Sequence, residues 1–132
     1  NISELYLHEN IIELEPSALS GLTSLTGFTV AENNTALCAD DGVLYNKDKT
    51  QLLYFPSAKN VSQYTVPESV VEICANCFGS CKYLKDIYVG AQVTTVTKRI
   101  FEYTTKPLVH TPTGSAMELL CIENDIAYDN IM

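Results

Sequence analysis

The sequence repeats itself at an interval of about 23 residues, and a repeat of this length restricts a chain to few folds. Residues 64–73 (YTVPESVVEI) recur as residues 87–96 (IYVGAQVTTV), with apolar residues in matching places. The same interval separates Leu5 from Phe28, so the pattern extends upstream. Such a unit cannot bury an apolar face by itself and becomes stable only when neighbouring units stack. We therefore expect a solenoid whose turns bury a shared apolar ladder.

Each repeat begins with a short segment in which apolar and polar residues alternate. Side chains alternate between the two faces of a strand, so two apolar residues of each segment should point inward. The return segments, such as residues 75–81, are too short for a long helix and favour one helical turn or a 3₁₀ turn. The expected inward pairs are Leu5 and Leu7, Phe28 and Val30, Tyr64 and Val66, and Ile87 and Val89.

An insertion interrupts the second repeat and is predicted to form a β-hairpin over about residues 42–56. Residues 42–45 (GVLY) and 50–56 (TQLLYFP) have the composition of strands. Residues 46–49 (NKDK) suit the turn between them because Asn and Asp tolerate left-handed backbone conformations. The hairpin could project for contacts or pack as a brace along the solenoid edge, and the sequence leaves both roles open.

The pattern changes after residue 106. Residues 107–112 suit a last strand, and residues 116–124 form an apolar stretch with the character of a helix. Ser115 can cap this helix, and Glu118 follows at the spacing of a capping box. An open solenoid end exposes apolar surface, so we expect this helix to cover the C-terminal end. Its inward residues should be Met117, Leu120 and Cys121.

Residues 66–73 (VPESVVEI) and 77–84 (CFGSCKYL) resemble the repeat of the BspA-like, or Treponema-type, leucine-rich family, and the hairpin resembles that family too. The family repeat has an Ile-Pro-x-x-Val strand end, an Ile-Gly turn, an Ala-Phe pair and Gly-Cys-x-x-Leu. Cys74 stands where Gly is usual, Cys77 and Ile100 stand where Ala is usual, and the third unit lacks the proline after its strand. The period and the inward pattern are unaffected. The resemblance implies an α/β solenoid, a short right-handed leucine-rich-repeat superhelix.

We expect a single domain over residues 1–132. The sequence begins with Asn1, and no signal peptide precedes the repeats, so we also expect a fragment of a longer protein. The repeats should cover residues of about 2–27, 28–63 with the hairpin, 64–86 and 87–107, followed by a C-terminal cap over residues 108–132.

The composition narrows the possible partners. Eight basic and sixteen acidic residues give a net charge of −8, which disfavours nucleic acid and anionic membranes because both bind clustered Lys and Arg. No apolar run is long enough to cross a bilayer, so we expect no membrane insertion of this segment. Five cysteines cannot all pair within the chain, and we expect free, buried thiols.

The residues that could carry chemistry favour packing or solvation instead. Cys74, Cys77 and Cys81 have a spacing that could hold zinc. Cys77 and Cys81, however, fall on repeat positions that Ala18 and Leu22 fill in one unit and Ile100 and Thr104 in another, which favours packing. His8 lies on an outward strand position and His110 in the expected last strand, so a Cys-His nucleophilic pair is not predicted. The carboxylates fall mostly on outward or turn positions. We therefore predict no enzyme activity, no cofactor and no metal.

The outward strand positions should align from repeat to repeat into one extended face. Tyr6 and Tyr88 are the first candidates for contact residues, because a tyrosine ring is large and apolar and ends in a polar group. The resemblance implies a module that binds a protein or glycan partner, as part of a cell-surface or secreted adhesin. The alternative is a structural spacer that supports another domain. The candidate partner-binding residues are Glu4, Tyr6, His8, Thr29, Gln63, Thr65, Asp86 and Tyr88.

Overall fold

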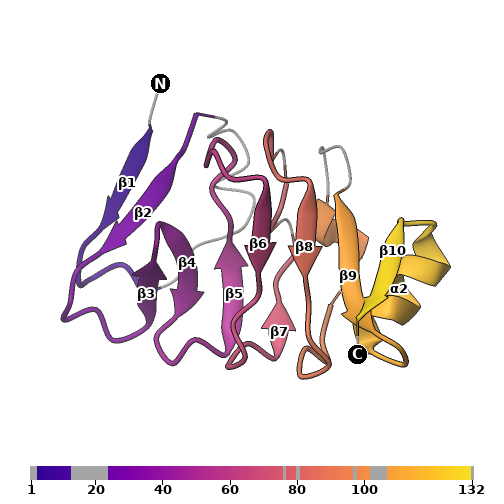
Figure 1. Cartoon of the computed structure of the whole chain (residues 1–132). Helices are drawn as coiled ribbons and strands as arrows, with labels where there is room; N and C mark the ends of the chain where they lie inside the picture. Colours follow the sequence, from indigo (N-terminus) through magenta and orange to yellow (C-terminus); the bar gives the residue numbers. More distant parts are fainter. Residues whose placement is uncertain are drawn as a thin grey trace.

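The computed structural model shows a solenoid of about five turns, with one α-helix near the C-terminus (Figure 1). It describes residues 3–12, 24–75, 77–79, 81–96, 98–101 and 107–131. The elements are β1 (Glu4–Leu7), β2 (Gly27–Val30), β3 (Leu37–Asp40), β4 (Val43–Asn46), β5 (Gln51–Tyr54), β6 (Gln63–Thr65), β7 (Glu72–Ile73), β8 (Asp86–Tyr88), the 3₁₀ helix η1 (Lys98–Phe101), β9 (Leu108–Pro112), α2 (Ala116–Asn124) and β10 (Tyr128–Ile131).

Four parallel strands, in the order β6, β8, β9 and β10, form one sheet, here named the front sheet. Tyr64 pairs with Ile87 and Ile87 pairs with Val109, so successive strands follow one another at nearly the same interval in the sequence. The ladder continues beyond the strands, since the N–H of Val66 donates to the carbonyl of Tyr88 at 2.9 Å. Val66 and Val89 are both buried. The predicted stacking of repeats into a shared apolar ladder is therefore confirmed.

β1 and β2 form a separate parallel sheet, here named the N-terminal sheet. Its register follows the repeat interval of the sequence, because Leu5 pairs with Phe28. β2 does not pair with β6. Instead the N–H of Phe28 donates to the carbonyl of Gly42, at 2.9 Å, in the turn between β3 and β4. The prediction of one continuous outward row across all repeats was wrong, because this turn packs against β2 and divides the row.

The inserted segment forms three antiparallel strands, β3, β4 and β5, and β7 continues this third sheet in parallel to β5. The expected pair of strands is present as β4 and β5, whereas β3 was not predicted. The turn between β4 and β5 is held by the side chain of Asn46, whose Oδ1 accepts from the N–H groups of Thr50 and Gln51, both at 2.9 Å. Lys49 in this turn has a positive φ of 59°.

These three inserted strands lie between two apolar cores. Leu44 and Tyr45 are neighbours on β4 and point to opposite faces, so Tyr45 joins one core and Leu44 the other. On β5, Leu52 joins the core of Tyr45 and Tyr54 joins the core of Leu44, because the register shifts between the Leu44–Tyr54 and Tyr45–Leu52 pairs. The smaller one, here named the N-terminal core, contains Leu7, Leu25, Phe28, Leu37, Leu44 and Tyr54. The larger one, here named the main core, includes Tyr45, Leu52, Phe55, Val66, Phe78, Ile87, Val89, Ile100, Phe101, Val109 and Met117.

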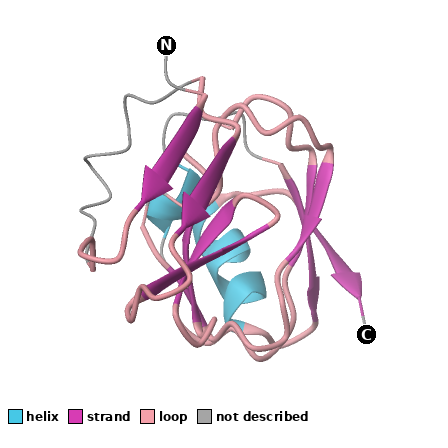
Figure 2. Ribbon diagram, turned by 90° about the vertical axis from the view of Figure 1, so that its left-hand side faces the viewer, coloured by secondary structure: helices cyan, strands magenta, loops and turns pink. Residues whose placement is uncertain are grey.

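The inserted segment is therefore an inner wall, and neither the projecting hairpin nor the edge brace describes it. In the view turned by 90°, some strands run along the right-hand side, whereas others cross the middle of the projection, where the helices are also seen (Figure 2).

The C-terminal helix matches its prediction closely. Ser115 is the N-cap, and its Oγ accepts from the N–H of Glu118 at 3.0 Å. Met117, Leu120 and Cys121 are its buried residues, as expected. β10 follows and pairs in parallel with β9, a strand that the sequence pattern did not predict. The helix therefore connects two neighbouring parallel strands as well as covering the core.

Candidate functional site

The outward face of the front sheet gathers four of the candidate residues. Gln63 and Thr65 on β6 are exposed and pair in register with Asp86 and Tyr88 on β8, which are half-buried. Their side chains point away from the core because Tyr64 and Ile87, between them, pack against it or within it. The chain thus places an amide, a hydroxyl, a carboxylate and a phenol side by side on one surface.

His110 on β9 extends this face. It pairs in register with Tyr88, and the two rings stack with centroids 4.3 Å apart and an interplanar angle of 12°. His110 Nε2 lies 2.9 Å from Oδ1 of Asp86, and its Nδ1 lies 3.6 Å from Oδ2 of Asp129 on β10. The imidazole is held from both sides by carboxylates of the neighbouring strands. We name Gln63, Thr65, Asp86, Tyr88, His110 and Asp129 the front-face cluster.

Two members of the front-face cluster, His110 and Asp129, were missed as site residues in the sequence. His110 was placed in the last strand, but the interval from Tyr88 to His110 is shorter by one position than the interval from Thr65 to Tyr88. Asp129 lies on a strand that was not predicted, and the interval that separates it from His110 is shorter still. The strand register could have found both residues if the alignment had been extended from each strand to the next, with an interval that is allowed to vary in length.

Of the other four candidates, three lie on the N-terminal sheet and His8 directly follows β1, apart from the front-face cluster. Glu4, Tyr6, His8 and Thr29 are all exposed, and Tyr6 retains 59% of its accessible surface. Tyr6 pairs in register with Thr29. The structure therefore brings the eight candidates together as two groups of four, with the β3–β4 turn packed against β2.

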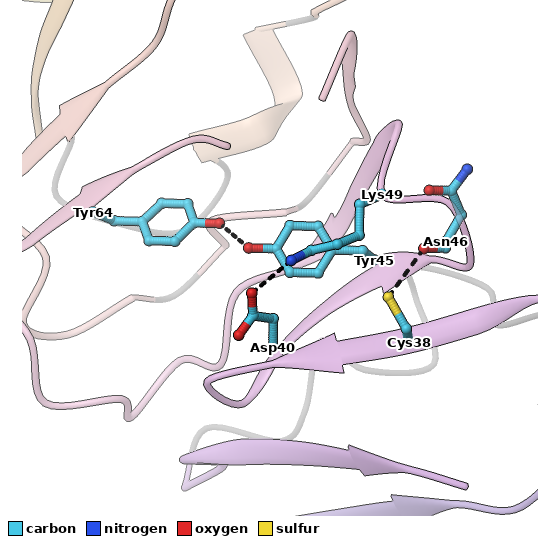
Figure 3. Close-up of polar contacts among 6 residues, drawn as sticks. All are labelled: Cys38, Asp40, Tyr45, Asn46, Lys49 and Tyr64. Carbon is cyan, nitrogen blue, oxygen red and sulfur yellow. Dashed lines mark hydrogen bonds and ion pairs between the residues drawn. The ribbon is translucent and has the colours of Figure 1, made fainter. Parts of the chain in front are cut away.

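A second group of polar side chains connects the inner wall to the front sheet (Figure 3). The hydroxyl groups of Tyr45 and Tyr64 lie 2.5 Å apart, and Lys49 Nζ lies 2.5 Å from Asp40 Oδ2 and 5.0 Å from the centre of the Tyr45 ring. The Sγ of Cys38 donates to the carbonyl of Asn46 at 3.3 Å.

Burial is the main cause that raises the pKa of both Tyr45 and Tyr64, and for Tyr64 the hydrogen bond to Tyr45 raises the pKa further. The hydrogen bond to Asp40 raises the pKa of Lys49. Both phenols therefore stay neutral and the amine stays charged at neutral pH, which suits a structural contact and not proton transfer.

The cysteines pack as expected from their repeat positions. Cys77 and Cys81 are buried in the main core, and the five cysteines form no disulfide with one another. Burial raises the pKa of Cys77 well above its usual value, that of Cys81 to about 12 and that of Cys74 to about 11. Their thiols are protonated at neutral pH, whereas nucleophiles and metal ligands are thiolates. In the part of the chain that the structure describes, no three His, Cys, Asp or Glu residues are grouped to hold a metal ion.

Half of the chain, residues 49–114, matches the model of the BspA type leucine-rich repeat region, in six copies. The chain belongs to this family. The resemblance seen in the sequence is thereby confirmed. No curated protein matched the chain.

Solved structures of bacterial proteins share the fold. A leucine-rich repeat protein from Eubacterium ventriosum is 28% identical over 83% of this chain and 30% of its own, with a TM-score of 0.76. A leucine rich cell surface protein from Faecalibacterium prausnitzii is 21% identical over 82% of this chain and 29% of its own, with a TM-score of 0.71. The pneumococcal vaccine antigen PcpA is 17% identical over 100% of this chain and 56% of its own, with a TM-score of 0.61. This BspA-type chain thus spans less than two thirds of each.

No helix among the described residues of this BspA-type chain is long and apolar enough to cross a membrane.

Proposed function

We propose that this BspA-type module is a non-catalytic binding unit that holds a protein or glycan partner on the front-face cluster. The stack of Tyr88 on His110, fixed between Asp86 and Asp129, is the observation that carries the proposal. Side chains that are already held in place lose little conformational freedom when a partner binds, which favours affinity. An aromatic ring surrounded by polar groups is also a frequent composition of protein recognition surfaces.

The same geometry is poorly suited to catalysis. Both nitrogens of His110 face carboxylates, and one face of its ring is covered by Tyr88. A general base needs a nitrogen directed at its substrate, and no described cysteine offers a thiolate nearby. The proposed placement is on a cell surface or in a secreted adhesin. It is supported by the family and by the solved relative from F. prausnitzii, which is itself named a cell surface protein.

Replacement of Tyr88 by Ala tests the proposed face. The variant should lose binding to whichever member of a panel of extracellular matrix proteins and immobilised glycans the unchanged chain binds. Tyr83→Ala is the matched control, because Tyr83 is 45% exposed and lies outside the cluster. Tyr6→Ala should separately show whether the N-terminal sheet contributes.

Circular dichroism should show the same fold in all three variants. Binding that survives Tyr88→Ala would count against this face. An unchanged chain that binds nothing on the panel would favour the alternative, a structural spacer.

A further inference from the structure

We infer that a groove beside α2 binds an apolar side chain of an extended protein segment that also carries a basic residue. The groove has a volume of about 190 Å³ and is lined by Thr94, Val96, Ala116, Leu119, Leu120 and Glu123. It lies between α2 and the end of the sheet that β5 and β7 form, and none of the front-face cluster lines it. This surface is therefore separate from the one in the proposed function.

One wall of the groove is an open strand edge. Thr95 forms an isolated parallel bridge with Glu72 on β7. Its N–H donates to the carbonyl of Val71 at 3.2 Å, and its carbonyl accepts from Ile73 at 3.0 Å, so both of its backbone groups face β7. In a planar trans peptide the carbonyl of one residue and the N–H of the next point in opposite directions, so the Thr94 carbonyl and the Val96 N–H point away from β7. No described residue forms a hydrogen bond with either group.

The other wall belongs to a helix that is apolar on two sides. Met117, Leu120 and Cys121 face the main core, while Leu119 and Ile122 are 56% and 57% exposed on the other side. A helix in a soluble protein usually presents polar residues to water on the side that faces away from the core. Exposed apolar residues next to a groove mark a contact surface.

The open edge indicates what form the partner takes. An extended segment can add to a sheet edge by main-chain hydrogen bonds, while its alternate side chains enter neighbouring pockets. A segment lying along Thr94–Val96 would extend the sheet of β5 and β7 by one strand. Its side chain facing α2 would fill the groove between Val96 and Leu119.

Charge indicates the remaining chemistry. Glu123 lines the groove, Glu118 lies on the same helix, and the last turn of α2 carries no basic residue. The chain as a whole has a net charge of −8. A second copy would bring the same negative charge to this surface, whereas a basic segment would be attracted to it. The occupant is therefore a basic, partly apolar segment of another protein.

Two labelled hexapeptides test this inference by fluorescence polarisation. In one, a Lys stands two residues from a Leu, so that both side chains can face α2, and the other carries Glu in place of that Lys. The basic peptide should bind saturably and at least tenfold more tightly than the acidic one. Leu119→Glu should weaken binding of the basic peptide at least tenfold, and Glu123→Lys should reverse the preference between the two peptides.

Ile12→Glu is the matched control, since Ile12 is 61% exposed and the variant adds the same charge away from α2. It should bind the basic peptide as the unchanged chain does. Equal weakening by Leu119→Glu and Ile12→Glu, or no saturable binding at all, would overturn the inference.

Analytical ultracentrifugation of the unchanged chain tests whether a second copy of the chain occupies the groove instead. A dimer that Leu119→Glu dissociates would show that a second copy fills the groove, and the inference would be wrong. Tyr88→Ala should leave peptide binding unaltered. The result is thus independent of the proposed function of the front face.

Discussion

Asn34 shows how a single buried polar residue joins two turns of the solenoid. Its side chain is 1% exposed and forms four hydrogen bonds with the main chain. Nδ2 donates to the carbonyls of His8, at 3.1 Å, and Ile11, at 2.7 Å, while Oδ1 accepts from the N–H groups of Ala36 and Leu37, both at 2.8 Å. One amide thus satisfies two carbonyls from the loop after β1 and two N–H groups at the start of β3 and just before it.

Asn34→Ala should lower the free energy of unfolding by about 2–4 kcal/mol, because buried backbone groups lose their partners. Urea unfolding followed by circular dichroism would measure it. Asn33→Ala is the control, since the Asn33 side chain is exposed and donates only to Glu9 among the described residues. That change should cost no more than about 0.5 kcal/mol. Equal costs for the two variants would contradict the role given to Asn34.

Single residues also show what the sequence could and could not reveal. The repeat alignment predicted that Cys77 and Cys81 pack in the core, and both are buried. Asn34 falls in no repeated motif, and its contribution to stability depends on backbone groups that belong to the preceding turn of the solenoid. Such a contact needs the fold before it can be recognised. The stack of Tyr88 on His110 has the same origin, because it joins two strands whose separation differs from the repeat interval.

At the scale of elements, the turn between β3 and β4 decides how the strands are divided into sheets. Gly42 has a φ of +81°, and Asp41 before it has a φ of 51°. A Cβ on Gly42 would lie 3.1 Å from the Cα of Gly27 on β2. The turn can approach β2 this closely only because neither glycine has a side chain.

Gly42→Ala should therefore be more destabilising than Gly114→Ala. Gly114 has a similar φ of +85°, but a Cβ there would meet nothing within 4 Å, so it isolates the conformational cost. That cost is about 1–2 kcal/mol, and displacement of packed backbone at Gly42 should add about 1–3 kcal/mol. Chemical denaturation of both variants would give the difference. If they unfold at the same denaturant concentration, the close packing of the turn on β2 is wrong.

The hairpin illustrates the limit of pattern analysis for elements. Alternation and turn residues predicted β4 and β5. Both roles considered for the hairpin, however, a projection and an edge brace, would bury at most one of its faces. Val43, Leu44 and Tyr45 are consecutive and all buried, which is the pattern of a strand covered on both faces. That run was visible in the sequence and indicates an inner wall. β3 was harder to predict, because its half-buried Cys38 and Ala39 give little alternation.

The connection between α2 and β10 should respond to acid. Glu118 accepts hydrogen bonds from the N–H of Gly114 and from the Asn130 side chain, both at 2.8 Å, and these lower the pKa of its carboxyl group. A lowered pKa in the folded state means that the stabilisation is present above the unfolded pKa of about 4.3 and is lost as the pH falls.

Glu118→Gln should accordingly lower the melting temperature at pH 6, and its difference from the unchanged chain should shrink toward pH 3. Thermal melts at several pH values would test this. Glu123→Gln is the control on the same helix, because that carboxylate forms no hydrogen bond with a described residue. A difference for Glu118→Gln that stays constant with pH would contradict the assignment.

At the scale of the whole molecule, the inner wall divides the solenoid into cores of unequal size. Of the described residues, six buried apolar side chains form the N-terminal core and twenty-one form the main core. The repeat interval predicted one shared apolar ladder, because repeats of equal length suggest that every turn packs on the next in the same way. The insertion changes this, since it replaces the direct pairing of β2 with β6. Regions with few buried apolar contacts open at lower free energy than the rest of a protein.

Amides of β1 and β2 should therefore exchange with deuterium before those of β8 and β9, with an opening free energy lower by about 1–2 kcal/mol or more. Phe28→Ala should widen this gap, because the Phe28 ring packs edge-on against Tyr54, with centroids 5.7 Å apart, inside the N-terminal core. The removed ring is worth about 3–5 kcal/mol, yet exchange in β8 and β9 should hardly change.

Ile87→Ala, in the main core, should by contrast accelerate exchange throughout, since the inner wall packs on that core as well. Hydrogen exchange measured by mass spectrometry would separate these segments. If Phe28→Ala accelerated amide exchange in β8 as much as in β1, the two cores would unfold as one unit. The inner wall would then not separate two regions of different stability.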